Sequence, residues 1–114
     1  MSDNIVQKKS FQFALEIISL YKELKNEKEF IISKQLLKSG TSIGANVEEA
    51  IAAQSRKDFI NKMSIAYKEA RETNYWLRLL NESRLTEINI IKYLEEVLEL
   101  NKLLSSIIKS TKEK

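Results

Sequence analysis

Five cations and one tyrosine occur at spacings that would bring them together if residues 56–82 form a helix. At 100° per residue they fall within about 120° of one another, on a face roughly 30 Å long. These residues are Arg56, Lys57, Lys68, Arg71, Tyr75 and Arg78. Such an array could follow the phosphates of a nucleic acid, with the tyrosine available to stack on a base. The alternative is an ordinary solvated helix face, with Glu72 and Glu82 offsetting its charge.

Four carboxylates offer a second kind of chemistry, on two successive predicted helices. They are Glu48, Glu49, Glu69 and Glu72. Di-iron bundles pair such glutamates with histidines, whereas a site built from oxygen ligands alone would favour Mg²⁺ or Ca²⁺. We favour ion pairs instead, in which Glu48 or Glu49 meets Arg71 or another cation across helices. We therefore expect no metal site and no cofactor.

The composition limits catalysis, because the chain of 114 residues contains neither cysteine nor histidine. It lacks the thiolate nucleophile, the usual general base and any disulfide framework, so we expect no enzyme, no catalytic residue and a cytoplasmic location. The start, MSDNIVQKKSF, is polar, and no apolar stretch approaches the roughly 18 residues of a membrane span. A net charge of +3, from 19 basic and 16 acidic residues, is by itself weak evidence for a nucleic-acid partner.

Three polar turns, near residues 25–28, 53–55 and 81–86, divide the chain into four periodic segments of similar length. We predict helices over about 5–25, 28–53, 56–82 and 87–111, forming one domain over 1–114. Short connections make successive helices antiparallel, so the predicted fold is an all-α, up-down-up-down four-helix bundle. Ser55 followed by Asp58 predicts the N-cap of the third helix, and Thr86 followed by Glu87 that of the fourth.

Both glycines of the chain lie within residues 39–50, SGTSIGANVEEA. A phosphate-binding loop would need the Gly-x4-Gly-Lys-Ser/Thr spacing or a three-glycine fingerprint, and neither is present. On a helix, Gly40 and Gly44 fall inside an apolar arc, where each costs about 1 kcal/mol relative to alanine. We therefore expect a compensating close approach by a neighbouring backbone or by a ring such as Trp76 or Tyr67.

The third helix carries two apolar faces, which need two partners. The first face comprises Phe59, Met63, Ala66, Ala70 and Leu77, and the second comprises Ile65, Trp76 and Leu80. We assign the first to the bundle core and the second to a neighbouring subunit. Asn46, beside the apolar stripe of the second helix, is expected to hydrogen-bond across an interface and set its register.

The stretches QLLKSGTSIGANVEEA (35–50) and SRKDFINKMSIAYKEARETNYWLRLL (55–80) resemble the bacterial four-helix bundle family named after proteins encoded within 23S rRNA intervening sequences. The resemblance implies an antiparallel bundle that assembles into homopentamers, with no known catalytic residues. The family also includes the accessory variability determinant of diversity-generating retroelements, a basic barrel that binds nucleic acid and a reverse transcriptase. Where some relatives carry histidine, this chain has Asn61 and Asn74, which argues against a role for a titratable ring there.

Two functions remain open at this point. The first is a non-enzymatic homo-oligomer, pentameric by resemblance, that binds structured RNA or DNA as an accessory factor. Its partners would be further copies of itself, a nucleic acid, and a reverse transcriptase or another protein, with no membrane. The second is a protein-interaction scaffold whose basic stripe serves only solubility.

Overall fold

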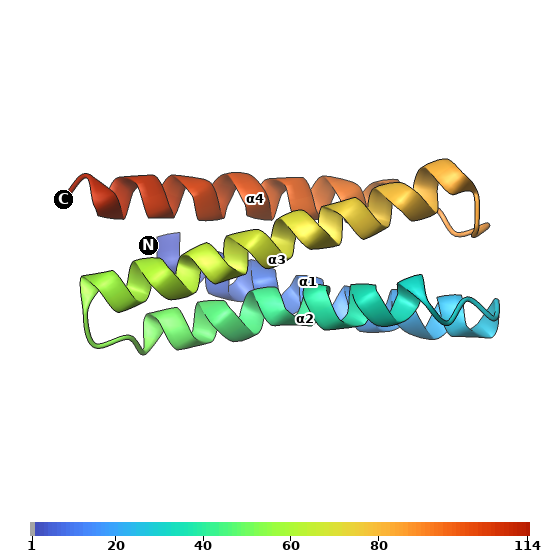
Figure 1. Ribbon diagram of the computed structural model, residues 1–114, viewed down its shortest axis with the longest axis horizontal. Helices are drawn as coiled ribbons and strands as arrows, with labels where there is room; N and C mark the ends of the chain where they lie inside the picture. Colours follow the sequence, from blue (N-terminus) through green and yellow to red (C-terminus); the bar gives the residue numbers. More distant parts are fainter. Residues whose placement is uncertain (1) are drawn as a thin grey trace.

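Four long helices lie side by side along one axis (Figure 1). The structure is a computed structural model that describes the backbone of residues 2–114 and the side chains of residues 5–114. The helices are α1 (Ser2–Asn26), α2 (Ile32–Ile51), α3 (Arg56–Ser83) and α4 (Ile91–Lys112), and residues 2–114 contain no strand. The result is a rod of 46 × 20 × 20 Å with the two chain ends at one end and the α1–α2 and α3–α4 turns at the other.

Each helix packs against two neighbours, in the cyclic order α1, α2, α3, α4. Within the described residues the diagonal pairs, α1 with α3 and α2 with α4, have no Cα atoms within 8 Å of each other. Successive helices run in opposite directions (Figure 1). The prediction of an all-α, antiparallel, up-down-up-down arrangement is confirmed for the chain itself.

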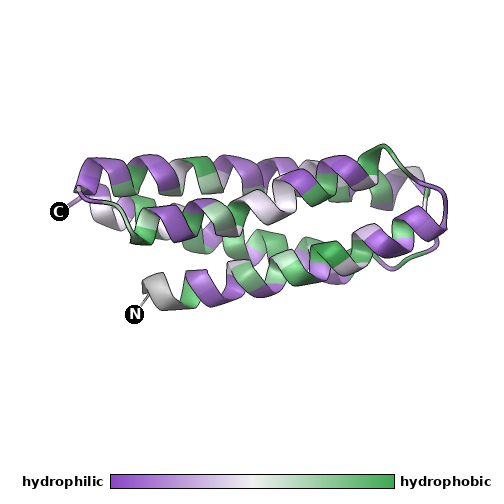
Figure 2. Cartoon of the chain, turned by 90° about the horizontal axis from the view of Figure 1, so that it is seen from below, coloured by the Kyte–Doolittle hydropathy of each residue, from purple (hydrophilic) through white to green (hydrophobic). Residues whose placement is uncertain are grey.

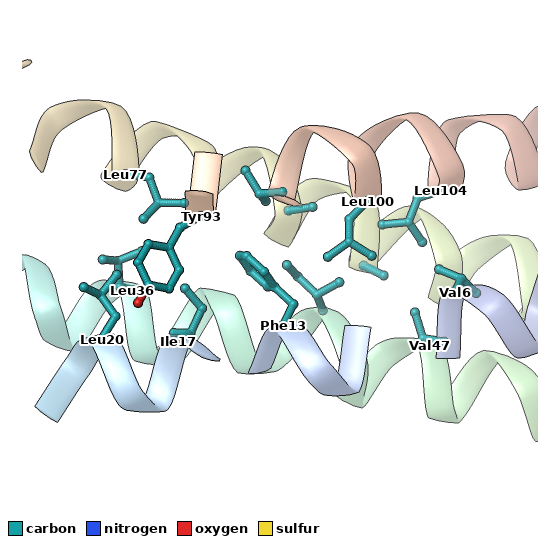
Figure 3. Close-up of a cluster of buried hydrophobic side chains, with 14 of the residues drawn as sticks. Val6, Phe13, Ile17, Leu20, Leu36, Val47, Leu77, Tyr93, Leu100 and Leu104 are labelled. Atoms are coloured by element: carbon teal, nitrogen blue, oxygen red, sulfur yellow. The ribbon is translucent and has the colours of Figure 1, made fainter. Parts of the chain in front are cut away.

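Buried residues recur along every helix at alternating spacings of three and four. They are Val6, Ser10, Phe13, Ile17, Leu20 and Leu24 of α1; Ser33, Leu36, Gly40, Ile43, Val47 and Ala50 of α2; Met63, Ala66, Ala70, Thr73, Leu77 and Leu80 of α3; and Ile90, Tyr93, Val97, Leu100, Leu104 and Ile107 in and next to α4. This seven-residue period is the pattern of left-handed helical bundles, and its side chains meet in layers between the helices (Figure 3). Hydrophobic residues accordingly gather on the sides of the helices that face one another (Figure 2).

The α1–α2 turn shows why α2 begins at Ile32 rather than at the predicted residue 28. Lys28 adopts the left-handed conformation (φ 66°), its N–H bonds the Lys25 carbonyl at 2.8 Å, and the Glu29 N–H bonds the Leu24 carbonyl at 2.9 Å. This pattern of bonds is a Schellman motif, which ends α1. The Glu29 carboxylate then accepts from the N–H groups of Ile31, Ile32 and Ser33 at 2.6–3.1 Å, so it caps α2.

The predicted cap of α3 is confirmed, since the Ser55 hydroxyl accepts from the Asp58 N–H at 3.0 Å. The predicted cap of α4 is wrong, because the Asn89 side chain, not Thr86, accepts from the Ile91 N–H, at 3.1 Å. Thr86 accepts from the Ile88 N–H at 3.1 Å and donates to the Glu27 carboxylate at 2.6 Å, which ties the two turns at this end together. The α4 helix therefore begins at Ile91, four residues later than predicted.

Candidate nucleic-acid interface and packing faces

The cations predicted to share a face of α3 do so. Arg56, Lys57, Lys68, Arg71 and Arg78 are all exposed, and Tyr75 is 50% exposed. Lys57, Arg71 and Arg78 are separated by multiples of seven residues, as are Lys68 and Tyr75. The buried residues of α3 repeat with the same seven-residue period. Each of these two sets of residues therefore keeps one direction relative to the core, on the outer side of α3. We call this set of six residues the α3 cationic face.

None of these five cations forms a salt bridge with a carboxylate whose side chain the structure describes. The Arg71 guanidinium instead lies over the Tyr67 ring, 5.8 Å from its centroid, a cation–π contact that leaves its charge uncompensated. Glu72, expected to offset this charge, accepts a hydrogen bond from Trp76 Nε1 at 3.1 Å. The five cations are therefore not held in salt bridges with described carboxylates and are available to contact phosphates.

The sequence analysis missed a further contribution to this surface from α4. Lys109 and Lys112, in the last turn of α4, line a groove of about 460 Å³ together with Ser64 and Tyr67 of α3, and one carboxylate, Glu113, lies in the same lining. This contribution could have been predicted from the sequence, because an antiparallel α3–α4 pair brings the last turns of α4 beside the first turns of α3. The basic surface thus spans two helices at the end of the rod where both chain termini lie.

The two glycines lie where α2 approaches α1. A Cβ built on Gly40 would come within 2.9 Å of Ile17 Cγ2, and one on Gly44 would lie 3.4 Å from the Ser10 carbonyl oxygen. The close neighbour is therefore α1, and the suggested rings of Trp76 and Tyr67 are not the groups nearest to either glycine. Residues 32–51 are helical throughout, so the stretch is not a loop.

Asn46 and Trp76 do not have the contacts expected of them. The Asn46 amide donates to the Ser42 carbonyl of its own helix at 2.9 Å, so within the chain it sets no register across a seam. Trp76 is half-buried and meets the Tyr75 ring edge-on, with centroids 5.2 Å apart. Leu80, assigned to a subunit contact, is fully buried in the bundle core. The second apolar face of α3 is therefore reduced to Ile65 and Trp76, both half-buried.

One row of exposed apolar side chains lies on α1, while others lie at the two turns and on α4. Phe11, Leu15 and Ile18 are 58%, 47% and 36% exposed and follow one another at helical spacing. Beside them runs a groove of about 290 Å³ whose other wall is α2, at Thr41, Gly44, Ala45 and Glu48. We call this the α1–α2 groove.

Three of the four carboxylates considered for a metal site, Glu48, Glu49 and Glu72, have separate partners. Glu48 accepts from the Gln7 amide at 3.0 and 3.1 Å. The predicted ion pair across helices is confirmed, since Glu49 of α2 pairs with Lys62 of α3 at 2.9 Å, with Lys62 and not Arg71 as the cation. Burial, followed by the nearby charge of Glu72, raises the pKa of Glu69. Among the residues that the structure describes, no group of three or more potential metal ligands comes together.

Fold and surface together define a class, the antiparallel four-helix bundle with a basic outer face. The chain belongs to the family of 23S rRNA-intervening sequence proteins, which it matches over residues 2–106. The structure is also similar to the crystal structure of a protein of unknown function from the S23 ribosomal protein family of Bacteroides thetaiotaomicron VPI-5482. The two chains are 57% identical, with a TM-score of 0.90 over 96% of this chain and 99% of the other. No curated protein matches.

Proposed function

We propose that this protein is a non-enzymatic, homo-oligomeric bundle that binds structured RNA or DNA through the α3 cationic face. The observation that carries the proposal is a set of five exposed cations on one helix, without carboxylate partners among the described side chains, extended by Lys109 and Lys112 of α4. Each cation that replaces a counterion on a phosphate gains free energy by releasing that ion. A cytoplasmic location suits such a role.

The resemblance favours a pentamer, and the α1–α2 groove supplies apolar surface for a subunit contact. Five chains of charge +3 would carry a net charge of about +15, and the potentials of neighbouring subunits add over a Debye length of roughly 10 Å. Assembly would thus strengthen binding to a polyanion without any new contact. Half-exposed Phe11 and Leu15 are the side chains that such a contact would bury.

The test is fluorescence polarisation of a labelled RNA hairpin at low and moderate salt. If all five cations contact phosphates, the logarithm of the affinity should fall with the logarithm of the salt concentration, with a slope of about −4 per subunit engaged. The double reversal Arg71→Glu/Arg78→Glu should weaken binding and leave the oligomer intact. The control Lys22→Glu/Lys34→Glu makes the same charge change at exposed positions on α1 and α2 and should weaken binding less. Absence of binding at both salt concentrations would refute the proposal.

A second function, a protein-interaction scaffold, is favoured by the α1–α2 groove itself. Phe11 is 58% exposed, and a partner helix could lay its apolar face along Phe11, Leu15 and Ile18. A reverse transcriptase or another protein would then bind without nucleic acid. Its sign would be a partner that co-purifies with the wild type but not with Phe11→Ser, in a sample whose absorbance ratio shows no nucleic acid.

A further inference from the structure

The α1–α4 seam holds a cavity of about 260 Å³ that the proposed function does not use. Phe13 of α1 and Leu100 of α4, each 2% exposed, form its apolar lining, and charged side chains surround it. Two of these are carboxyls from opposite sides of the seam, Glu16 of α1 and Glu96 of α4. Two ionised carboxylates on neighbouring helices would repel each other. Whether both are ionised therefore depends on the groups around them.

Two cations near the cavity are paired, whereas a third, Lys8 of α1, lines it without a salt bridge to any described carboxylate. Lys92 Nζ lies 3.0 Å from Glu16 Oε1, and Lys9 forms a salt bridge with Glu99. Glu96 Oε1 is buried and has no hydrogen-bond donor among the described groups. The remaining groups that act on Glu96 are Glu16 from α1, and Lys92 and Glu99 from its own helix. No described cation forms a salt bridge with Glu96, which shares the lining of the cavity with the carboxyl of Glu16.

Burial raises the pKa of Glu96 to about 7, with the hydrogen bond to Glu16 and the charge of Glu16 adding to the effect. Lys92 acts in the opposite direction but is the smaller influence. The physical reason is that two carboxylates in the lining of one cavity resist being ionised together when a salt bridge compensates only one of them, Glu16. Sharing a proton removes the repulsion and adds a strong hydrogen bond.

We propose that Glu16 and Glu96 bind one proton between them across the α1–α4 seam, and that this proton is a pH-responsive latch on the bundle. With the proton in place, the Glu96 hydroxyl donates to the Glu16 carboxylate, which Lys92 holds from its other side. When the proton leaves to solvent, two carboxylates face each other with one cation. The seam then loosens, and water reaches the cavity beside Phe13 and Leu100.

The sign of the pH dependence follows from linkage. In the folded chain Glu96 keeps its proton to a higher pH than in the unfolded chain, where the carboxyl has its ordinary pKa of 4.5. The folded state therefore binds more protons between that value and about 7, and stability falls as the pH rises through this window. A carboxylate stabilised by a salt bridge would have the opposite effect, because stability would then rise with pH.

Thermal unfolding of the whole protein between about pH 5 and about pH 8, at constant ionic strength, tests the latch. The melting temperature of the wild type should fall across this range. Glu96→Gln, a neutral hydrogen-bond donor of the same shape, should abolish most of that fall. Glu95→Gln, an exposed neighbour on the same helix, should retain it. Identical profiles for wild type and Glu96→Gln would overturn the proposal.

Two further measurements keep the proposal testable if Glu96→Gln does not fold. In the wild type, a carbon-detected NMR titration should show the Glu96 carboxyl changing protonation well above its ordinary range, and a titration at the ordinary value would refute the shared proton. Hydrogen exchange, corrected for intrinsic rates, should show α1 and α4 losing protection relative to α2 and α3 as the pH rises. Uniform protection would refute the loosening of the seam.

Discussion

Alanine substitutions at Gly40 and Gly44 should change stability in opposite directions, although both residues lie in adjacent turns of α2. In a helix interior, glycine to alanine gains about 1 kcal/mol from backbone entropy and helix propensity. The difference between the two sites comes from what the new methyl group meets. At Gly44 the nearest atoms belong to Ser10 at 3.4–3.5 Å, an ordinary van der Waals contact, so Gly44→Ala should stabilise the protein by about 1 kcal/mol.

At Gly40 the same methyl group would lie 2.9 Å from Ile17 Cγ2 and 3.0 Å from Ile17 Cγ1. Ile17 cannot easily give way, because it is fully buried and its β-branched side chain has one strongly preferred rotamer in a helix. Overpacking of this kind costs about 1–3 kcal/mol. After the propensity gain is subtracted, Gly40→Ala should be destabilising by about 0–2 kcal/mol, so the two variants should differ by roughly 1–3 kcal/mol.

Urea unfolding of both variants at one protein concentration would measure this difference from the transition midpoints. A double-mutant cycle with Ile17→Ala adds a control, because that change removes both clashing carbons. In the Ile17→Ala background, Gly40→Ala should become stabilising, while Gly44→Ala should keep its effect. Equal stabilisation by the two glycine substitutions in the wild-type background would refute the assignment of Gly40 to a close α1–α2 contact.

Three further changes test features of the turns and the surface. Glu29→Ala should lower the unfolding free energy by about 1–2 kcal/mol, because three N–H groups at the start of α2 lose their acceptor; denaturant unfolding measures this, and Glu29→Gln should recover part of the loss. Lys28→Gly should raise the unfolding free energy by up to about 1 kcal/mol, since glycine adopts positive φ without strain, and a loss of stability would contradict the Schellman description. Phe11→Ser/Leu15→Ser should reduce the sedimenting mass of an oligomer and leave the helical content unchanged, whereas an unaltered mass would exclude the α1–α2 groove as the subunit contact.

The fold was predictable because its main signals are local. Apolar residues at spacings of three and four, short polar turns and the absence of proline sufficed for four antiparallel helices. The helix start at 87 was wrong because Thr86 bonds Glu27 and the Asn89 side chain accepts from the Ile91 N–H instead. The start at 28 was wrong because the competing signals there were unusual ones. A lysine occupies the left-handed position that ends α1, and a glutamate side chain reaches back to cap α2. Neither residue type is the expected one at such a position.

The surface was only partly predictable, because it depends on how the helices are rotated about their axes. The α3 cationic face could be found from one helix alone, whereas the contribution of Lys109 and Lys112 required the α3–α4 pairing. Leu80 was placed at a subunit contact because a single helical wheel does not show where the core is centred. Polar residues at core positions, such as Ser39 and Thr73, which hydrogen-bond each other at 2.9 Å, further obscured the buried stripes.

The shared seven-residue period of core and cations restricts how this chain can change in length. One residue inserted within α3 between Ala66 and Arg71 would rotate everything beyond it by about 100°, turning Arg71 and Arg78 out of line with Lys57. The same rotation would carry Leu77 and Leu80 away from the layers that they complete. Insertions and deletions should therefore be tolerated only in the turns at 27–31, 52–55 and 84–90. The distance between Lys57 and Arg78 along α3 should stay constant.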